Sequence, residues 1–92
     1  MTRHSSTERA LRAQVGRRVR TCRVWLGLSQ DQVAAKAGVT RNFVSAIERG
    51  QMTLDAWRLG LVASAFGTTV GWLLDEPGTT GPSDSPPVGS AG

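Results

Sequence analysis

Cysteine and histidine are almost absent from this sequence. Its 92 residues include one cysteine, Cys22, and one histidine, His4. A single cysteine cannot form a disulfide within the chain, and this pair cannot supply the three or four ligands of a zinc site. No apolar run approaches the ~18 residues that a membrane-spanning helix needs. The opening residues MTRHSSTERA lack the apolar segment of a secretory signal. We therefore expect a cytoplasmic protein with no metal and no cofactor.

The sequence also lacks the parts of a catalytic site. His4 lies near the terminus, no glycine-rich loop of the kind that holds a phosphate is present, and no carboxylate pair projects from one face into a cleft. The length suits one small domain, so we expect no second domain that could hold a small-molecule inducer. We expect no enzymatic activity, no catalytic residues and no small-molecule ligand.

The charge is distributed very unevenly. Residues 1–50 contain ten basic and three acidic side chains, whereas residues 51–92 contain one basic and four acidic ones. A strongly basic half next to a mildly acidic half indicates that one face meets a polyanion such as nucleic acid. An ordinary solvated surface is the alternative, because charge alone does not separate the two.

Composition divides the chain into three parts. The segment from Pro77 to Gly92 contains all four prolines and little that could be buried, so it should be a disordered Pro/Gly/Ser-rich tail. We expect residues 1–6 to be a flexible N-terminus. The working domain is then 7–76, which is large enough to fold without disulfides if its helices pack well.

Glycines and hydroxyl residues at regular intervals predict helices within this domain. Four glycines (Gly27, Gly38, Gly50 and Gly67) each follow an apolar periodic run, and each is followed by a hydroxyl residue that can cap the next helix (Ser29, Thr40, Thr53 and Thr69). Ser29 and Gln32 have the spacing of a capping box. We predict helices at 7–26, 30–37, 41–48, 54–66 and 70–75, and no sheet. Trp25 should pack beneath its own helix.

Apolar residues at helical spacing predict a single core. They recur every three or four positions in each predicted helix. The expected core residues are Leu11, Val15, Val19, Cys22, Leu26, Val33, Ala34, Ala37, Phe43, Val44, Ile47, Leu59, Val62, Ala63, Phe66, Val70, Leu73 and Leu74.

The stretch LSQDQVAAKAGVTRNFVSAIERG carries the functional signal. It predicts two short capped helices joined by a tight turn at Gly38 and Val39, which is the pattern of a helix-turn-helix. The second helix of such a motif can enter the major groove of DNA, which is ~12 Å wide. Structural bundles also contain helical hairpins, so the spacing alone leaves that alternative open.

From about Val19 to Leu74 the chain resembles the Cro and phage-repressor type of helix-turn-helix proteins, also called the XRE family. The resemblance rests on LGLSQDQVAAKAGV, TRNFVSAIERG and the ending GTTVGWLL, in this order. It implies an all-α, compact five-helix fold of the lambda-repressor type, and binding to double-stranded operator DNA, usually as a symmetric dimer. The family includes repressors, activators and the antitoxins of toxin pairs.

The resemblance assigns backbone contacts to the start of the second helix. Gln30 matches a family glutamine that contacts a phosphate, and Ser29 caps a helix N-terminus that favours a phosphate oxygen. Arg17 and Arg18 are expected near the same helix start in this fold, as further phosphate contacts. Arg49 either contacts a phosphate or balances the dipole of the third helix.

If Phe43, Val44 and Ile47 of the third helix point to the core, helical periodicity places five other side chains outward. These are Arg41, Asn42, Ser45, Ala46 and Arg49. Three of them, Arg41, Asn42 and Ser45, match the base-reading positions of the family. Arginine can bind guanine O6 and N7, and asparagine can bind adenine N6 and N7. Ala46 also faces outward, but offers only a methyl group to thymine. A merely solvated face is the alternative for each residue.

Two further assignments concern structure rather than DNA. In the family, the acid at Glu48 pairs with an arginine of the first helix, which matches Arg23 here. A second apolar stripe on the fourth helix, Leu54, Trp57, Leu61 and Ala65, is predicted to form a twofold dimer contact together with Trp72. Alternatively, the N-terminal part of the first helix or the tail covers this stripe.

These observations predict a sequence-specific, double-stranded DNA-binding transcriptional regulator that acts as a homodimer on a pseudo-palindromic operator. The alternative is an antitoxin or protein-interaction adaptor that uses the apolar stripe of the fourth helix to bind another protein. Gly60 inside that helix costs about 1 kcal/mol relative to alanine.

Overall fold

The computed structural model describes residues 3–51 and 55–74, which form five α-helices and, within these ranges, no strand. The helices are α1 (Arg3–Trp25), α2 (Gln30–Ala37), α3 (Arg41–Glu48), α4 (Ala56–Phe66) and α5 (Val70–Leu74). The predicted all-α, five-helix architecture is confirmed. The predicted tail at 77–92 lies outside the described residues.

The helix ends follow the capping chemistry predicted for α2 and α3. Ser29 Oγ accepts a hydrogen bond from the Gln32 amide at 3.0 Å, and Gln32 Oε1 accepts one from the Ser29 amide at 2.8 Å, which completes the capping box. Thr40 Oγ1 accepts from the Phe43 amide at 3.1 Å. The four glycines that follow the apolar runs all have φ between +68° and +77°, the left-handed conformation that ends a helix.

Two predicted boundaries are wrong. α1 begins at Arg3 instead of residue 7, while the flexibility expected for residues 1–6 stays a prediction. α4 is capped by Asp55 rather than Thr53, and Thr53 itself lies outside the described residues. The Asp55 carboxylate accepts hydrogen bonds from the amides of Trp57 (3.0 Å) and Arg58 (3.4 Å), which a carboxylate at an N-cap does as well as a hydroxyl.

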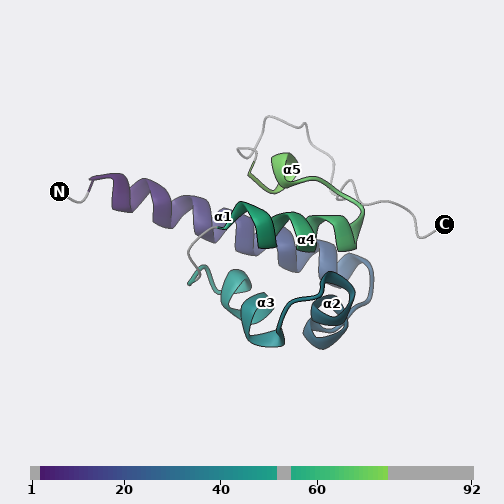
Figure 1. Ribbon diagram of the computed structural model, residues 1–92. Coiled ribbons are helices and arrows are strands. Elements are labelled where there is room, and N and C mark those ends of the chain that lie inside the picture. Colours follow the sequence, from purple (N-terminus) through teal and green to yellow (C-terminus); the bar gives the residue numbers. More distant parts are fainter. Residues whose placement is uncertain (1–2, 52–54, 75–92) are drawn as a thin grey trace.

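The long helix α1 organises the molecule (Figure 1). α4 runs alongside it, α2 and α3 lie together on one side, and α5 lies on the opposite side. The N-terminal part of α1 projects beyond the other helices. The pair α2 and α3 is therefore displayed on one side of the molecule, supported from behind by α1 and α4.

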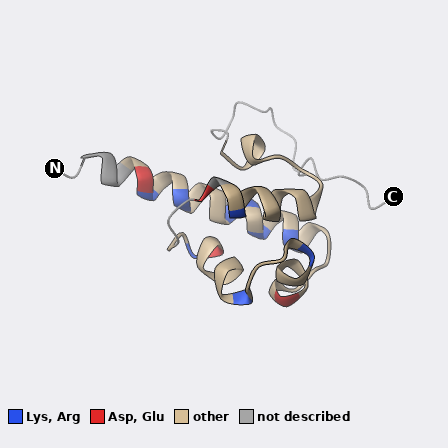
Figure 2. Ribbon diagram, in the orientation of Figure 1, with Lys and Arg blue, Asp and Glu red and all other residues tan. Residues whose placement is uncertain are grey.

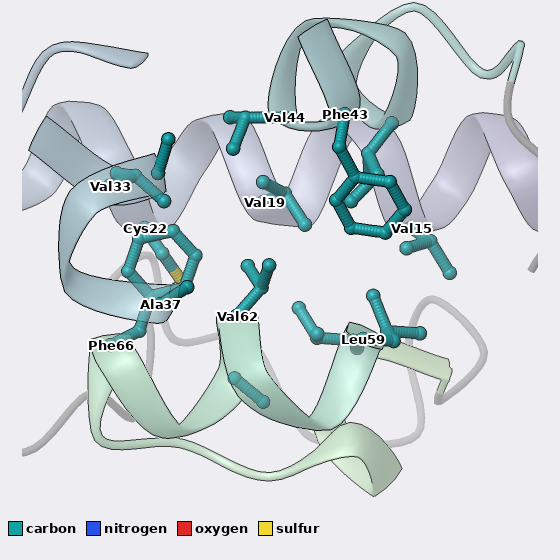
Figure 3. Close-up of a cluster of buried hydrophobic side chains, with 14 residues drawn as sticks. Val15, Val19, Cys22, Val33, Ala37, Phe43, Val44, Leu59, Val62 and Phe66 are labelled. Atoms are coloured by element: carbon teal, nitrogen blue, oxygen red, sulfur yellow. The ribbon is translucent and has the colours of Figure 1, made fainter. Parts of the chain in front are cut away.

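One apolar core joins the helices. Val15, Val19 and Cys22 of α1 converge with side chains of α2, α3 and α4 (Figure 3). The fully or almost fully buried set is Val15, Val19, Cys22, Val33, Ala34, Ala37, Phe43, Val44, Ile47, Leu59, Val62, Ala63, Phe66 and Leu73. All fourteen belong to the core predicted from the sequence. Leu26, Val70 and Leu74 are only partly buried against it.

α1 is closely packed on α3 and tied to α5. A Cβ atom added to Gly16 would lie 2.3 Å from the carbonyl oxygen of Ile47, so only glycine permits this approach. On the other side of α1, Gln14 Nε2 donates to the carbonyl of Leu73 at 3.4 Å and Arg18 Nη1 donates to the carbonyl of Trp72. These contacts fix where α3 and α5 sit on α1.

Among the helices in the described ranges, none combines the length and the apolar character needed to cross a lipid bilayer.

Candidate nucleic-acid interface

The turn between α2 and α3 has the geometry of a helix-turn-helix. The amides of Gly38 and Val39 both donate to the carbonyl of Ala34, at 2.9 and 3.0 Å, and this closes α2 through the left-handed Gly38. After Val39, Thr40 caps α3 at once. The two helices pack against each other and are anchored by their buried faces, so α3 is held as a rigid rod.

The outward face of α3 carries the predicted base-reading residues. Arg41 and Asn42 are exposed, and Ser45 and Ala46 are half-buried. The Arg41 side chain is 62% exposed, and its Nε lies 3.7 Å from Oδ1 of Asp31, which is also exposed. An exposed ion pair of this length contributes at most about 1 kcal/mol, so it does not prevent Arg41 from binding another acceptor. Figure 2 shows basic positions along α1 and on α3.

The ion pair between Arg23 and Glu48 is present and joins α1 to the end of α3. Arg23 Nε lies 2.6 Å from Glu48 Oε2, and Nη2 lies 3.0 Å from Oε1, which is a two-bond contact. The side chains are only 17% and 6% exposed. The hydrogen bond to Glu48 raises the pKa of Arg23 above its ordinary value, because it favours the charged guanidinium. Arg23 Nη1 also donates to the carbonyl of Leu28 at 3.2 Å.

Gln30 is tied to the same cluster. Its Nε2 donates to Glu48 Oε1 at 3.2 Å, so the first residue of α2 is linked to the last residue of α3. The Ser29 hydroxyl, in turn, is occupied as the acceptor of the Gln32 amide. The structure therefore shows how both residues are held, while their contacts with phosphate stay predictions.

The expectation that Arg18 lies beside the start of α2 is wrong. Its guanidinium stacks over the indole of Trp72, 4.7 Å from the ring centre, and donates to the Trp72 carbonyl. This position follows from the helical period, because Arg18 projects from the same side of α1 as Gln14, which also contacts α5. Arg17 lies instead on the exposed face of α1, where it stays a predicted phosphate contact.

Arg49 follows α3 directly and has two partners within the described residues. Its Nη1 donates to the hydroxyl of Ser45, and its Nε donates to Oε1 of Gln51 at 3.0 Å. The side chain is therefore directed back along α3, with its guanidinium beside Ser45.

The predicted dimer residues do not form one free stripe. Leu54 lies outside the described residues, whereas Leu61 and Ala65 are half-buried and pack against the core. Trp72 is also half-buried, under Arg18. α5 covers part of α4, which the sequence pattern did not predict. A Cβ atom added to Gly60 of α4 would lie 3.8 Å from the side chain of Val70 in α5. Among the described members of this set, Trp57 alone is strongly exposed, at 75%.

Three features of the structure differ from the sequence predictions or were missed by them. Trp25 is 56% exposed, so the expectation that it packs beneath its own helix is wrong. The Arg58 guanidinium of α4 lies over the Phe43 ring of α3, 5.2 Å from its centre. The close packing of α3 on Gly16 was also not predicted, although a glycine in the interior of a helix is a signal of such packing.

The chemistry of the described residues is limited. Within residues 3–51 and 55–74 no three His, Cys, Asp or Glu side chains are grouped so that they could hold a metal ion. Burial raises the pKa of the Cys22 thiol to about 11, and the nearby charge of Arg18 lowers it by less. Cys22 is thus a protonated core residue at neutral pH.

The comparison with known families agrees with the geometry. The sequence profile of the helix-turn-helix family matches residues 19–73, which is more than half of the chain. The chain therefore belongs to the helix-turn-helix family of the Cro and phage-repressor type, the XRE family of DNA-binding transcriptional regulators.

Two curated relatives match most of this chain. A hypothetical transcription factor of Neisseria meningitidis is 34% identical over 70 residues, which are 76% of this chain and 66% of the relative. A cyanate hydratase of Albidiferax ferrireducens is 36% identical over 69 residues, which are 72% of this chain but 47% of the enzyme. The chain thus spans less than two thirds of the length of either relative.

Solved structures share the fold. The Neisseria factor superposes with a TM-score of 0.70 at 34% identity, over 76% of this chain and 80% of that chain. The clp gene regulator ClgR from Corynebacterium glutamicum gives 0.65 at 28% identity, over 70% and 82%. A tetramer of the restriction-modification controller protein C.Esp1396I, solved with its natural 35 base-pair operator, gives 0.63 at 24% identity, over 68% and 83%. The last likeness concerns the fold alone.

Proposed function

We propose that this protein is a sequence-specific transcriptional regulator that binds double-stranded DNA as a homodimer on a pseudo-palindromic site, and that it catalyses no reaction. The observation that carries the proposal is the exposed face of α3. Arg41 and Asn42 stand outward from a helix whose opposite side is buried as Phe43, Val44 and Ile47. These side chains have the donors and acceptors that distinguish guanine and adenine in the major groove.

Docking through α3 assigns a role to each neighbouring residue. Arg41 and Asn42 read base edges, with Ser45 and Ala46 beside them on the same face. Ser29, Gln30 and Arg17 contact phosphates and set the register without reading sequence. The link from Gln30 through Glu48 to Arg23 keeps α2 and α3 in fixed relation, which supports such a register.

A homodimer is the assembly that fits this mode of binding. Two copies related by a twofold axis place their recognition helices about one DNA turn, ~34 Å, apart. Occupation of the site would then block or recruit polymerase. C.Esp1396I, a protein of the same fold, has been solved as a tetramer on its operator, which supports assembly of several copies on DNA.

The test is selection of bound fragments from random duplex DNA, followed by binding measurements on the selected site. Affinity should fall by ~0.9 log units per phosphate contact for each tenfold rise in salt. Arg41→Ala and Asn42→Ala should each weaken binding to the selected site by about 1–3 kcal/mol and affect random DNA much less.

Arg20→Ala is the matched control, because this substitution removes the same charge from an exposed position on α1. Failure to enrich any sequence would refute the proposal. Equal losses on selected and random DNA would reassign Arg41 and Asn42 to backbone contacts.

A further inference from the structure

Arg49 is held in a position that differs from that of a freely extended surface arginine. It is the C-cap residue of α3, with φ −89° and ψ 0°. Its Nη1 donates to Ser45 Oγ and its Nε donates to Gln51 Oε1 at 3.0 Å, so residues on both sides of it in the sequence orient the guanidinium. The side chain is exposed. It is thus oriented by the protein and remains exposed to solvent.

The contact with Ser45 places the guanidinium on the reading face. With ~3.6 residues per turn, position 49 lies above positions 45 and 42, four and seven residues earlier. Ser45 and Asn42 are both outward residues of α3. Because the arginine folds back by one turn, its charged end lies beside the middle of α3 rather than beyond its end.

The remaining donors match one base. Of the five N–H groups of a guanidinium, two of those of Arg49 are used by partners in the described part of the chain, which leaves three. The three are the second N–H of Nη1 and both N–H groups of Nη2, and one N–H from each of these nitrogens can form the two parallel bonds that fit O6 and N7 of guanine. Ala46, the neighbouring outward residue, has only a methyl group and does not compete for these acceptors.

We propose that Arg49 is a further base-reading residue, which selects a guanine through O6 and N7, and that Ser45 and Gln51 are its positioning residues. This inference rests on the proposed function, since it requires α3 to lie in the major groove. It assigns to Arg49 sequence selection in place of the phosphate contact or dipole balance considered from the sequence.

The first experiment repeats the selection from random duplexes with Arg49→Ala and Arg49→Lys. We expect both variants to lose the preference for guanine at one position of each half-site and to keep the preferences at the others. Affinity for the wild-type site should fall about 10- to 100-fold in both, because lysine keeps the charge but cannot make the two parallel bonds. Binding that Arg49→Lys restores, or a consensus unchanged in Arg49→Ala, overturns the inference.

The second experiment tests the acceptor directly. The guanine that Arg49→Ala no longer selects is replaced by 7-deazaguanine, which lacks N7 and keeps its base pairing. We expect the replacement to weaken binding of the wild-type protein several-fold and to leave binding of Arg49→Ala unchanged. Equal effects on both proteins overturn the inference, because Arg49 would then not contact N7.

Two controls separate the possible failures. Gln51→Ala should reduce the same guanine preference to a smaller extent, and a uniform loss at all positions overturns the positioning role. Arg20→Ala, which removes one exposed charge from α1, should keep the full consensus. If the wild-type protein selects no sequence, the proposed function fails. If it selects one that Arg49→Ala shares, only the assignment of Arg49 fails.

Discussion

At the residue scale, Glu48 joins three helices of the candidate interface. It accepts from both Nε and Nη2 of Arg23 and from Gln30, and thereby links α1, α2 and α3. The carboxylate is almost buried, so its charge is stabilised by these donors instead of by water. A charge held in this way fixes geometry, because any displacement of one helix leaves a donor or an acceptor unpaired.

Removal of one member of this pair should destabilise the fold. Glu48→Gln leaves the Arg23 guanidinium without its carboxylate, and we expect a loss of about 3 kcal/mol in the free energy of unfolding, measured by urea denaturation. The double variant Arg23→Met with Glu48→Leu should recover much of this loss. Glu8→Gln is the control, since the exposed pair of Glu8 and Arg12 (3.3 Å) contributes only about 0.3–0.5 kcal/mol. Equal costs for Glu48→Gln and Glu8→Gln would contradict this account.

Cys22 allows a second test at this scale. Burial raises the pKa of its thiol to about 11, so at pH 8 only about one molecule in a thousand carries the reactive thiolate, and that thiolate is enclosed by the core. We expect a disulfide reagent to label Cys22 at pH 8 only as fast as the protein unfolds. Labelling should become rapid in denaturant, where the pKa returns to its ordinary value. Fast labelling of the folded protein at pH 8 would show that the α1 core is open.

At the element scale, two of the glycines inside helices, Gly16 and Gly60, have opposite roles. Gly16 lies where α1 touches the end of α3, and a Cβ there would lie 2.3 Å from the Ile47 carbonyl oxygen and 2.9 Å from that of Glu48. Gly60 lies where α4 meets α5, and its Cβ would contact only the side chain of Val70 at 3.8 Å. The first glycine is required by packing, whereas the second is not.

Alanine at these two sites should therefore act in opposite directions. We expect Gly16→Ala to lower the free energy of unfolding by about 2–3 kcal/mol, because backbone oxygens cannot give way as a flexible side chain can. Gly60→Ala should raise it by up to about 1 kcal/mol, the difference in helix propensity. Thermal denaturation of both variants checks the pair, and a stabilising Gly16→Ala would mean that α1 and α3 are not packed as described.

At the scale of the whole molecule, α4 has one part that is covered by its own chain and one part that is exposed. Leu61 and Ala65 are partly covered by the core of the same chain, and Arg18 covers Trp72. Trp57 remains exposed at the start of α4. An exposed indole next to half-buried apolar residues is a suitable centre for a contact between two proteins.

Trp57→Ser should weaken self-association without weakening the fold. Because the side chain is mostly in water, we expect the free energy of unfolding to change by less than about 0.5 kcal/mol. The dissociation constant of the proposed homodimer, measured by analytical ultracentrifugation, should rise at least about tenfold, as for a residue at the centre of an interface. Binding to the selected operator should weaken with it.

The outcome of this experiment also distinguishes a dimer contact on this surface from a contact with another protein. An unchanged dimer in Trp57→Ser would place the twofold contact elsewhere. A wild-type protein that is monomeric at all concentrations, yet binds a heterologous protein through Trp57, would favour the adaptor alternative.

Local patterns in the sequence determined the five helices, the N-caps of α2 and α3, and the core. Left-handed glycines, hydroxyl caps and apolar spacing act within a few residues, so Ser29, Thr40 and Gly38 could be assigned without knowing the fold. The outward residues of α3 followed in the same way, because a helix that buries Phe43, Val44 and Ile47 must expose the others.

Tertiary structure alone decided which distant groups meet. Three contacts depend on how the helices pack across the core. Arg18 binds α5, α5 covers part of α4, and α3 approaches Gly16 closely. A sequence pattern specifies which side of a helix is apolar. It does not specify which of several apolar surfaces will cover that side, because this choice depends on the packing of all five helices together.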